Sequence, residues 1–335
     1  MNNTNKIFKF TSGWVSGFTQ SDGCFTIAFD KRKSGLGIRP KPIFVLTQDI
    51  SELDMFKQLH SYLGIGYITS SKKNVSLYIT NLSAISQVLI PIFEENPLKY
   101  GKLASYLIFK QIINMMLNKE HLVLKNLLTI IEYGFYINKE TTRLGNLGVD
   151  SKTNLLENLK NKHGLLPEIE NINLPFLDEK TKEKLTLDFI TGLIDGDGSF
   201  NVSFQHKPYH RVRVNFTVVQ ETSCRQVLND LKEFFACGKV YDLPSAASRY
   251  QVENLDLILN KIAPILNKVI FNTQKADHYN TLIKVSELIK YKGYKSNQDF
   301  LNIIELSYDS NKLGKRRFFT KEEFIAKIFE KEVTM

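Results

Sequence analysis

Cysteine is scarce in this 335-residue chain, and the three that occur, Cys24, Cys224 and Cys237, form no CxxC pair. Three isolated thiols make neither a disulfide framework nor half of a zinc site, so a reducing compartment is the expected environment. The histidines are few and scattered as well. His206 and His210 are four residues apart, but a proline separates them and no cysteine pair precedes them, which argues against zinc.

Long apolar runs are also missing. The most apolar stretch, "LASYLIFKQIINMML", is interrupted by Lys110 and is too short to span a membrane. The N-terminus has neither the apolar run of a signal peptide nor an arginine-rich transit pattern, so we expect no membrane partner. Hydrophobic residues still make up 43% of the chain, which is enough to build cores, and the length suits two domains.

Acidic residues are too few to balance the basic ones. Lys and Arg number 44 against 35 Asp and Glu, which gives a net charge of +9. An excess of this kind favours a polyanionic partner such as nucleic acid or a membrane surface. A merely soluble basic protein has the same signature, so charge alone does not decide the partner.

The sequence repeats itself. The stretch "VSGFTQSDGCF" (15–25) aligns with "TGLIDGDGSF" (191–200), which places Asp22 on Asp197. The alignment continues down the chain and places Gln48 on Gln220, Pro91 on Pro264, Lys102 on Lys275 and Tyr106 on Tyr279. The offset stays nearly constant over about a hundred positions, which chance rarely produces. We therefore interpret the chain as two copies of one domain.

Each copy shows the same order of periodic segments, α-β-β-α-β-β-α, which predicts an α+β fold with two pseudo-symmetric domains. After the Asp-Gly that ends the first helix, we expect strands at 24–30, 39–48, 199–205 and 210–220, helices at 51–63 and 223–235, hairpins at 66–80 and 238–253, and terminal helices at 83–118 and 255–290. The domains are predicted at 1–136 and 183–335. Residues 137–182 have the polar composition of a linker with a short helix at 150–160, and a basic tail begins after about residue 310.

Small residues recur at one-turn spacing in the segment before each Asp-Gly. Gly192 and Gly196 lie four residues apart, and so do Gly17 and Ser21. On a helix this spacing puts both small residues on one face, where two helix backbones can approach closely. If the two copies pack these faces together, the C-terminal ends of the two helices meet.

That packing would bring together the acids that end the two helices, Asp22 and Asp197. Two close carboxylates repel unless a cation lies between them, and Mg²⁺ suits carboxylates combined with water and substrate phosphates. Two metal ions beside a phosphodiester can activate a water and stabilise the leaving oxygen, so the pair indicates hydrolytic nuclease chemistry. The alternative is an Asp-Gly pair that merely ends a helix, which explains one copy better than two matched copies.

The strands after each acid alternate apolar and polar side chains, as expected of sheets with one buried face. In the second copy the polar face carries no carboxylate and consists of Ser199, Asn201, Ser203, Gln205, Arg211, Arg213, Asn215 and Thr217. Arg, Asn and Gln can pair with base edges in a major groove, although an ordinary solvated sheet face is the alternative. The first copy is less regular: its polar positions are Thr26, Asp30, Arg39 and Lys41, while Ile43 and Val45 either touch thymine methyl groups or signal a different register.

The two motifs and the strands that follow them resemble the LAGLIDADG homing endonucleases, in the single-chain form with two motif copies. "ITGLIDGDG" (190–198) is a close match and "VSGFTQSDG" (15–23) is a diverged one, and the resemblance covers both repeats. It implies a saddle of two antiparallel sheets on double-stranded DNA, with the motif helices at the domain interface. It also implies a monomer that reads a long asymmetric target and cuts both strands across the minor groove, leaving short 3′ overhangs.

The resemblance further implies roles for individual residues. The last acid of each motif, Asp22 or Asp197, would bind two or three divalent ions, Mg²⁺ with Ca²⁺ or Mn²⁺ as substitutes, helped by the backbone carbonyls of Ser21 and Gly196. The family also has catalytic glutamines at a strand end and lysines on the later helix, which match Gln48, Gln220, Lys102 and Lys275. Taken alone, these four would be a strand-end amide and a solvated lysine in each copy.

One position departs from the family's motif. Gln20 stands where the motif has an acid and where the second copy has Asp195. In the family that acid lies beside the helix interface and is not the principal metal ligand. We therefore expect a mild imbalance between the two sites and an intact centre.

Two functions fit this resemblance. One is an active, Mg²⁺-dependent, site-specific DNA endonuclease encoded by a mobile intron; the other is an intron maturase or a non-cleaving nucleic-acid-binding relative, with intron RNA as a partner. Paired acids favour the first, because binding alone does not need them. Non-specific phosphate contacts are expected from Lys31, Arg32, Lys33, Lys72, Lys73 and the "KRR" at 315–317. Plentiful Ile, Asn, Lys, Phe and Tyr indicate A/T-rich codons. Together with the resemblance to this family, they favour a fungal or other organellar intron and a mitochondrial or other organellar location.

Overall fold

A computed structural model of the chain describes residues 7–137, 149–169, 183–205, 211–294, 296–310 and 319–329. It divides into two compact units. The motif unit comprises Phe10–Gly196 and Glu221–Val227, and the C-terminal unit comprises Met1–Lys9, Asp197–Gln220 and Leu228–Met335. The boundary between the two compact units therefore differs from the boundary between the two repeats, because the second motif helix belongs to the same unit as the first. The domain limits drawn from the repeat stay a prediction.

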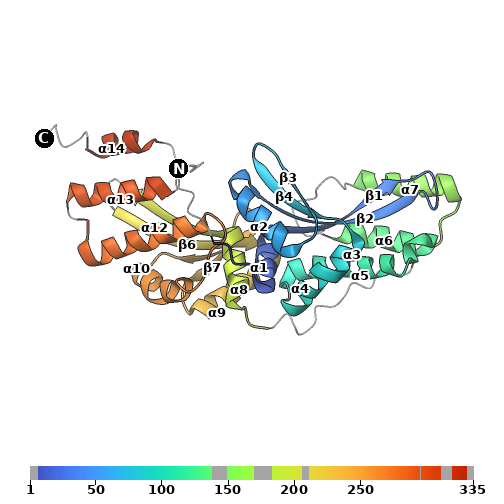
Figure 1. The fold of residues 1–335 in the computed structure, drawn as a ribbon, viewed down its shortest axis with the longest axis horizontal. Helices are drawn as coiled ribbons and strands as arrows, with labels where there is room; N and C mark the ends of the chain where they lie inside the picture. Colours follow the sequence, from blue (N-terminus) through green and yellow to red (C-terminus); the bar gives the residue numbers. More distant parts are fainter. Residues whose placement is uncertain are drawn as a thin grey trace. The chain divides into compact units, whose positions relative to one another are not determined.

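The motif unit contains a four-stranded antiparallel sheet in the order β1-β2-β4-β3. Its strands are β1 (Gly23–Lys31), β2 (Ile38–Asp49), β3 (Tyr67–Ser70) and β4 (Asn74–Ile79). Helices α5 (Tyr100–Leu117) and α6 (Leu124–Tyr136) pack against β1 (Figure 1). Between them lies an aromatic core in which the ring centroids of Phe25 and Phe109 are 5.2 Å apart. The other face of the sheet is left open for polar side chains.

The C-terminal unit repeats this arrangement with a sheet in the order β5-β6-β8-β7. Its strands are β5 (Gly198–Gln205), β6 (Arg211–Glu221), β7 (Lys239–Leu243) and β8 (Ala247–Val252). Helix α12 (Lys275–Glu287) packs against β5 and contributes Tyr279, whose ring centroid lies 5.2 Å from that of Phe200. Phe200 is stacked on Phe216 at 4.9 Å. The predicted order αββαββα, with antiparallel sheets, is confirmed for both copies.

The remaining helices agree with the predicted ranges but are more broken. They are α2 (Leu53–Leu63), α3 (Leu82–Ala84), α4 (Ile90–Glu95), α9 (Arg225–Phe235), α10 (Leu255–Leu257) and α11 (Ala263–Leu266), with π-helical turns at Ile85–Leu89 and Ile258–Ile262. The expected helix at 83–118 is interrupted at Asn96, which has φ −127° and ψ 84°. The cause is Pro97, which cannot donate a helical hydrogen bond and disfavours helical dihedrals in the residue before it.

The helix expected at 150–160 is present and slightly longer, and two further helices lie beyond the predicted ones. In the expected linker, α7 (Val149–His163) buries Leu155 and Leu159 against Leu127 and Ile131 of α6. Beyond the expected terminal helix lie α13 (Asn297–Ser310) and α14 (Lys321–Phe329). The basic "KRR" at 315–317 lies outside the described residues, as do His206 and His210.

Candidate active site and nucleic-acid interface

The two motif helices, α1 (Ser12–Asp22) and α8 (Leu187–Asp197), are in backbone contact within the motif unit. A Cβ atom on Gly17 would overlap the Phe189 carbonyl, and one on Gly192 would overlap the Trp14 carbonyl. The Ser21 hydroxyl donates a 3.0 Å hydrogen bond to the carbonyl of Leu193. The prediction that small residues at one-turn spacing let these helices approach closely is therefore confirmed.

The residue two positions before each motif-ending acid is buried and has a packing role. Asp195 is 1% exposed, and its Oδ2 accepts a 2.8 Å hydrogen bond from the indole Nε1 of Trp14 across the helix pair. Gln20 is also 1% exposed, and its Oε1 accepts from the backbone N–H of Lys99 at 2.9 Å, one residue before α5. The amide in the first copy thus has a structural partner of its own, and the expected mild imbalance between the two sites stays a prediction.

Asp22 ends α1 and is held from the neighbouring strand. Gln48, near the end of β2, donates from Nε2 to Asp22 Oδ2 at 2.6 Å. Lys102, in the first turn of α5, donates from Nζ to the carbonyl of Gly23 at 2.6 Å. A Cβ atom on Gly196 would lie 2.5 Å from Asp22 Oδ2, so the absence of a side chain at Gly196 leaves room beside this carboxylate. The predicted acid, amide and lysine of the first copy are therefore brought together.

Asp197 has the same partners within the C-terminal unit. Gln220, in β6, donates from Nε2 to Asp197 Oδ2 at 2.5 Å, and Gln220 is buried. Lys275, the first residue of α12, donates from Nζ to the carbonyl of Gly198. Each copy thus contains the same acid, glutamine and lysine with the same donors and acceptors. Their catalytic roles stay a prediction.

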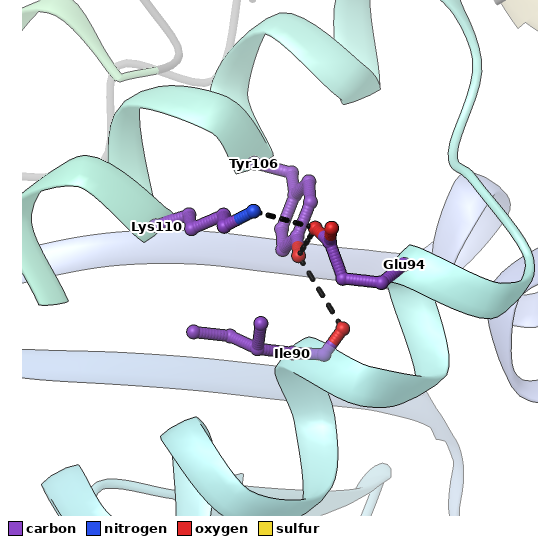
Figure 2. A network of polar contacts seen from close by, with 4 residues as sticks. All are labelled: Ile90, Glu94, Tyr106 and Lys110. Atoms are coloured by element: carbon purple, nitrogen blue, oxygen red, sulfur yellow. Dashed lines mark hydrogen bonds and ion pairs between the residues drawn. The ribbon is translucent and has the colours of Figure 1, made fainter. Parts of the chain in front are cut away.

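A hydrogen-bonded cluster fixes the helix that carries Lys102 (Figure 2). One turn along α5, the Tyr106 hydroxyl donates to Glu94 Oε1 of α4 at 2.9 Å, and Lys110 Nζ lies 2.8 Å from the same oxygen. Burial and the nearby Glu94 carboxylate raise the pKa of Tyr106 well above its usual range, so the hydroxyl stays a donor. In the second copy, Tyr279 donates to Asn267 Oδ1 at 2.6 Å. The repeat therefore preserves this support for the lysine helix.

The outer face of the C-terminal sheet has the predicted alternation along most of its length. Arg211 and Arg213 are exposed, Asn201 is exposed and donates to Ser199 Oγ at 2.8 Å, and Ser203 pairs with Arg213. Gln205 pairs with Arg211 at the end of β5. Near Asp197 the pattern changes: Thr217, which pairs with Ser199 at the start of β5, is only 6% exposed.

Two buried polar atoms on this sheet lack a hydrogen-bond partner. Asn215 Oδ1 is buried without a hydrogen-bond partner, and so is Nε of Arg249 on β8. An unpaired buried acceptor or donor costs roughly 1–3 kcal/mol. Both groups therefore gain from a polar ligand that reaches the sheet face.

The outer face of the motif-unit sheet resolves the register left open by the sequence. Thr26 pairs with Ile43 and Cys24 pairs with Val45, so both apolar residues share the outward face with the polar ones. Lys41 pairs with Ala28 on the same face. Asp30 lies 3.4 Å from Arg39 and 3.5 Å from Arg32, and thus orients two guanidinium groups.

The sequence analysis did not identify the outward side chains of the two hairpins as part of the polar sheet faces. In the motif unit, Tyr67 and Tyr78 stack with centroids 5.6 Å apart, and Thr47 is hydrogen-bonded to Ser76 at 2.8 Å. In the C-terminal unit the corresponding outward residues are Tyr241, Arg249 and Gln251, with Tyr241 bonded to both others. The alternation in "KVYDL" and "SRYQV" was the available signal, because it is the same alternation that marked the longer strands.

The described residues were also searched for metal-binding clusters and for membrane-spanning helices. No group of three or more His, Cys, Asp or Glu side chains among them could hold a metal ion by itself. None of their helices is both long enough and apolar enough to cross a membrane.

Comparison with known sequences identifies the class. The profile of the LAGLIDADG endonuclease family matches residues 15–113 and 190–286, which are the two repeats and more than half of the chain. The chain therefore belongs to the LAGLIDADG endonuclease family. The predicted family and homing-endonuclease function are confirmed.

Individual relatives agree with this assignment. The chain is 39% identical over 274 residues to the "Probable intron-encoded DNA endonuclease 1" of Mycosarcoma maydis, covering 82% of this chain and 98% of the relative. Among solved structures, I-SmaMI bound to cleaved DNA has the same fold, with a TM-score of 0.76 and 23% identity over 94% of this chain and 100% of that one. I-GzeII in complex with its DNA target gives a TM-score of 0.73 and 25% identity over 92% and 100% of the respective chains.

Proposed function

We propose that this protein is a Mg²⁺-dependent endonuclease that recognises a long asymmetric DNA target and cuts both strands, leaving short 3′ overhangs. The observation that carries the proposal is the duplicated group of acid, glutamine and lysine at the end of each motif helix. A chain that only bound nucleic acid would have no chemical need for the same carboxylate, held by the same donors, in both copies.

The donor set fits a hard divalent cation. Asp22 and Asp197 supply carboxylate oxygens, and Ser21 and Gly196 supply backbone carbonyls. Gly196 packs on Ser21 and Asp22, which supports a role for its backbone carbonyl near the first acid. Because the described side chains offer no closed cage, the remaining ligands would be water and DNA phosphates, as Mg²⁺ prefers. When bound, such ions lower the pKa of a water and stabilise the leaving oxygen.

The surrounding residues hold these acids in place. Gln48 and Gln220 each donate to one carboxylate oxygen, which fixes the direction of the remaining oxygen lone pairs. Lys102 and Lys275 place a positive charge beside the carbonyl that follows each acid. A cation at that place stabilises the charge that develops on a phosphate during hydrolysis.

The two sheet faces supply DNA recognition in this proposal. Base edges would be read by Thr26, Asp30, Arg39 and Lys41 in the first half-site and by Ser199, Asn201, Ser203, Gln205, Arg211, Arg213, Asn215 and Thr217 in the second. The unpaired Asn215 Oδ1 and Arg249 Nε support this assignment, because a base edge would satisfy them. Lys31, Arg32, Lys33, Lys72 and Lys73 would contact phosphates without reading sequence.

The relatives support a proposal for the cellular setting. Several relatives are named as probable intron-encoded endonucleases, among them Cox1-I1b of Schizosaccharomyces pombe, and another is named as a protein in ND4 intron 1 of Podospora anserina. We infer that this chain is likewise encoded in an organellar intron, that it acts as a monomer in the mitochondrial matrix, and that intron RNA is a further partner.

The test replaces each acid in turn by its isosteric amide. Asp22→Asn and Asp197→Asn should abolish double-strand cleavage of a target selected from a randomised duplex library with Mg²⁺, while affinity measured in Ca²⁺ stays within about threefold. Asp54→Asn is the matched control, because Asp54 is exposed on α2 and paired with Lys57. Full cleavage by either motif variant would refute the assignment, and equal loss in the control would indicate a general charge effect.

A further inference from the structure

Helix α7 is part of the core of the motif unit, although its composition is that of a linker. Leu155 and Leu159 are buried in one cluster with Leu127, Ile131 and Ile38, the first residue of β2. Lys152 Nζ lies 2.6 Å from Glu132 of α6, which fixes the N-terminal half of α7. In Figure 1, α7 lies beside the far end of the β1–β2 hairpin. The C-terminal turn of α7 is therefore anchored next to the loop that joins β1 and β2.

Two side chains of that turn bind this loop directly. Lys162 Nζ donates to the carbonyl of Lys33 at 3.0 Å, and His163 Nε2 lies 2.9 Å from the carbonyl of Leu36. The loop closes on itself through Arg32 N–H to the carbonyl of Gly37 at 2.8 Å. Gly37 has φ +92°, and a Cβ atom there would lie 2.9 Å from Lys162 Cδ, so the loop backbone and the lysine stem fit closely. The C-terminal end of α7 thus forms hydrogen bonds with two backbone carbonyls of the six-residue β1–β2 loop.

The β1–β2 loop and the end of β1 present positively charged side chains to solvent. Lys31, Arg32 and Lys33 are all exposed, and Asp30, which pairs with Arg32 and Arg39, is the acid next to them in sequence. A phosphate backbone is the partner that such a cluster fits. A free loop would lose conformational entropy on ordering against DNA, whereas a loop already held in shape avoids most of that loss.

We propose that Lys162 and His163 are positioning residues that hold the β1–β2 loop in the shape with which it binds the DNA backbone at the outer end of the half-site read by the first sheet. This inference rests on the proposed DNA-cleaving function and extends it: a segment between the two repeats helps to set the length of the target. In this proposal α7 supports DNA recognition and also forms part of the connection between the two repeats.

The experiment compares Lys162→Met and His163→Ala with two matched controls. Lys160→Met removes the same charge from the same exposed turn, and His163→Gln keeps an N–H donor near the position of Nε2. Equilibrium binding in Ca²⁺ is measured on the full target and on duplexes shortened at either end. The half-site of the second sheet is assigned beforehand from the base preference that Arg213→Ala removes.

We expect Lys162→Met and His163→Ala to bind the full target about fivefold to tenfold more weakly, with a salt slope lower by about 1 for each phosphate that the loop no longer neutralises. On the duplex shortened beside the first sheet they should equal the wild type, which also shows that they are folded. Both controls should stay within about twofold of the wild type on every duplex. Cleavage at saturating protein should not change.

Three outcomes would overturn the inference: no loss on the full target, an equal loss on all three duplexes, or a loss in Lys160→Met as large as in Lys162→Met. Each would leave the proposed function intact, because the wild type would still cleave its selected target. If the wild type selects no target at all, the proposed function fails first.

Discussion

From the contact between α1 and α8 we predict how much Gly192→Ala destabilises the protein. Its Cα lies so close to α1 that a Cβ atom would overlap the Trp14 carbonyl and lie 2.7 Å from the Phe18 nitrogen. Both neighbours are backbone atoms, so neither can rotate away. Gly192→Ala must therefore push the two helices apart.

The magnitude follows from opposing effects. Alanine is favoured over glycine in a helix by roughly 1 kcal/mol, which stabilises the variant. Overpacking typically costs about 1–3 kcal/mol, and separation by 0.5–1 Å forfeits about a quarter to a half of the dispersion energy between the facing atoms. With backbone on both sides the cost lies at the upper end, so we expect a net destabilisation of about 2 kcal/mol. Gly17→Ala should behave alike, and the double variant should cost less than the sum, because the helices need to separate only once.

The assay is guanidinium unfolding followed by the fluorescence of Trp14, the single tryptophan of the chain, which is 2% exposed at this same contact. Gly134→Ala in α6 is the control, because its Cβ would meet only the end of the Phe29 ring, at 2.9 Å. That variant should stay within about 1 kcal/mol of the wild type. If Gly192→Ala proved as stable as Gly134→Ala, the close backbone approach of the motif helices would be wrong.

The remaining predictions concern recognition and thiol chemistry. Arg211→Ala and Arg213→Ala should each cost about 1–3 kcal/mol at one base position of the second half-site in competition binding, whereas a uniform loss over all sequences would assign them to phosphates. Burial raises the pKa of the Cys237 thiol, outweighing the lowering by Tyr250 and Lys261, so less thiolate is present at pH 8. Mass spectrometry should therefore find exposed Cys24 alkylated before Cys237 and buried Cys224, and the reverse order would contradict the described burial.

The repeated part of the fold could be predicted from the sequence, because each motif and each periodic pattern occurs in both copies. The spacing of Gly17 and Ser21 alone is weak evidence for a helix contact, but the same spacing at Gly192 and Gly196 made it specific. The same applies to Gln48 and Lys102, whose hydrogen bonds are reproduced by Gln220 and Lys275. An isolated strand-end glutamine would not have been noticed.

The burial of the helix between the repeats, and the residues of the hairpins, could not be predicted from the sequence. In α7 the burial depends mainly on Leu155 and Leu159, with Leu156 beside them. Most of the other residues are polar, so the composition resembles that of a connecting segment. The hairpin residues Tyr67 and Tyr241 were missed because four- and five-residue strands carry too few alternations to separate a binding face from a solvated one. The partners of Gln20 and Asp195 could not be predicted either, since both depend on packing between segments far apart in sequence.

The bond between Trp14 and Asp195 makes the two halves of this gene product non-interchangeable. The repeat aligns Trp14 with Phe189 and Gln20 with Asp195, so neither copy encodes both the donor and the acceptor. A homodimer engineered from the C-terminal copy would have phenylalanine in place of the Trp14 donor opposite each buried aspartate, and a lost hydrogen bond to a charged group costs about 1.5–3 kcal/mol. The donor and the acceptor are present together only when both copies are, so this bond favours one chain that carries two different halves.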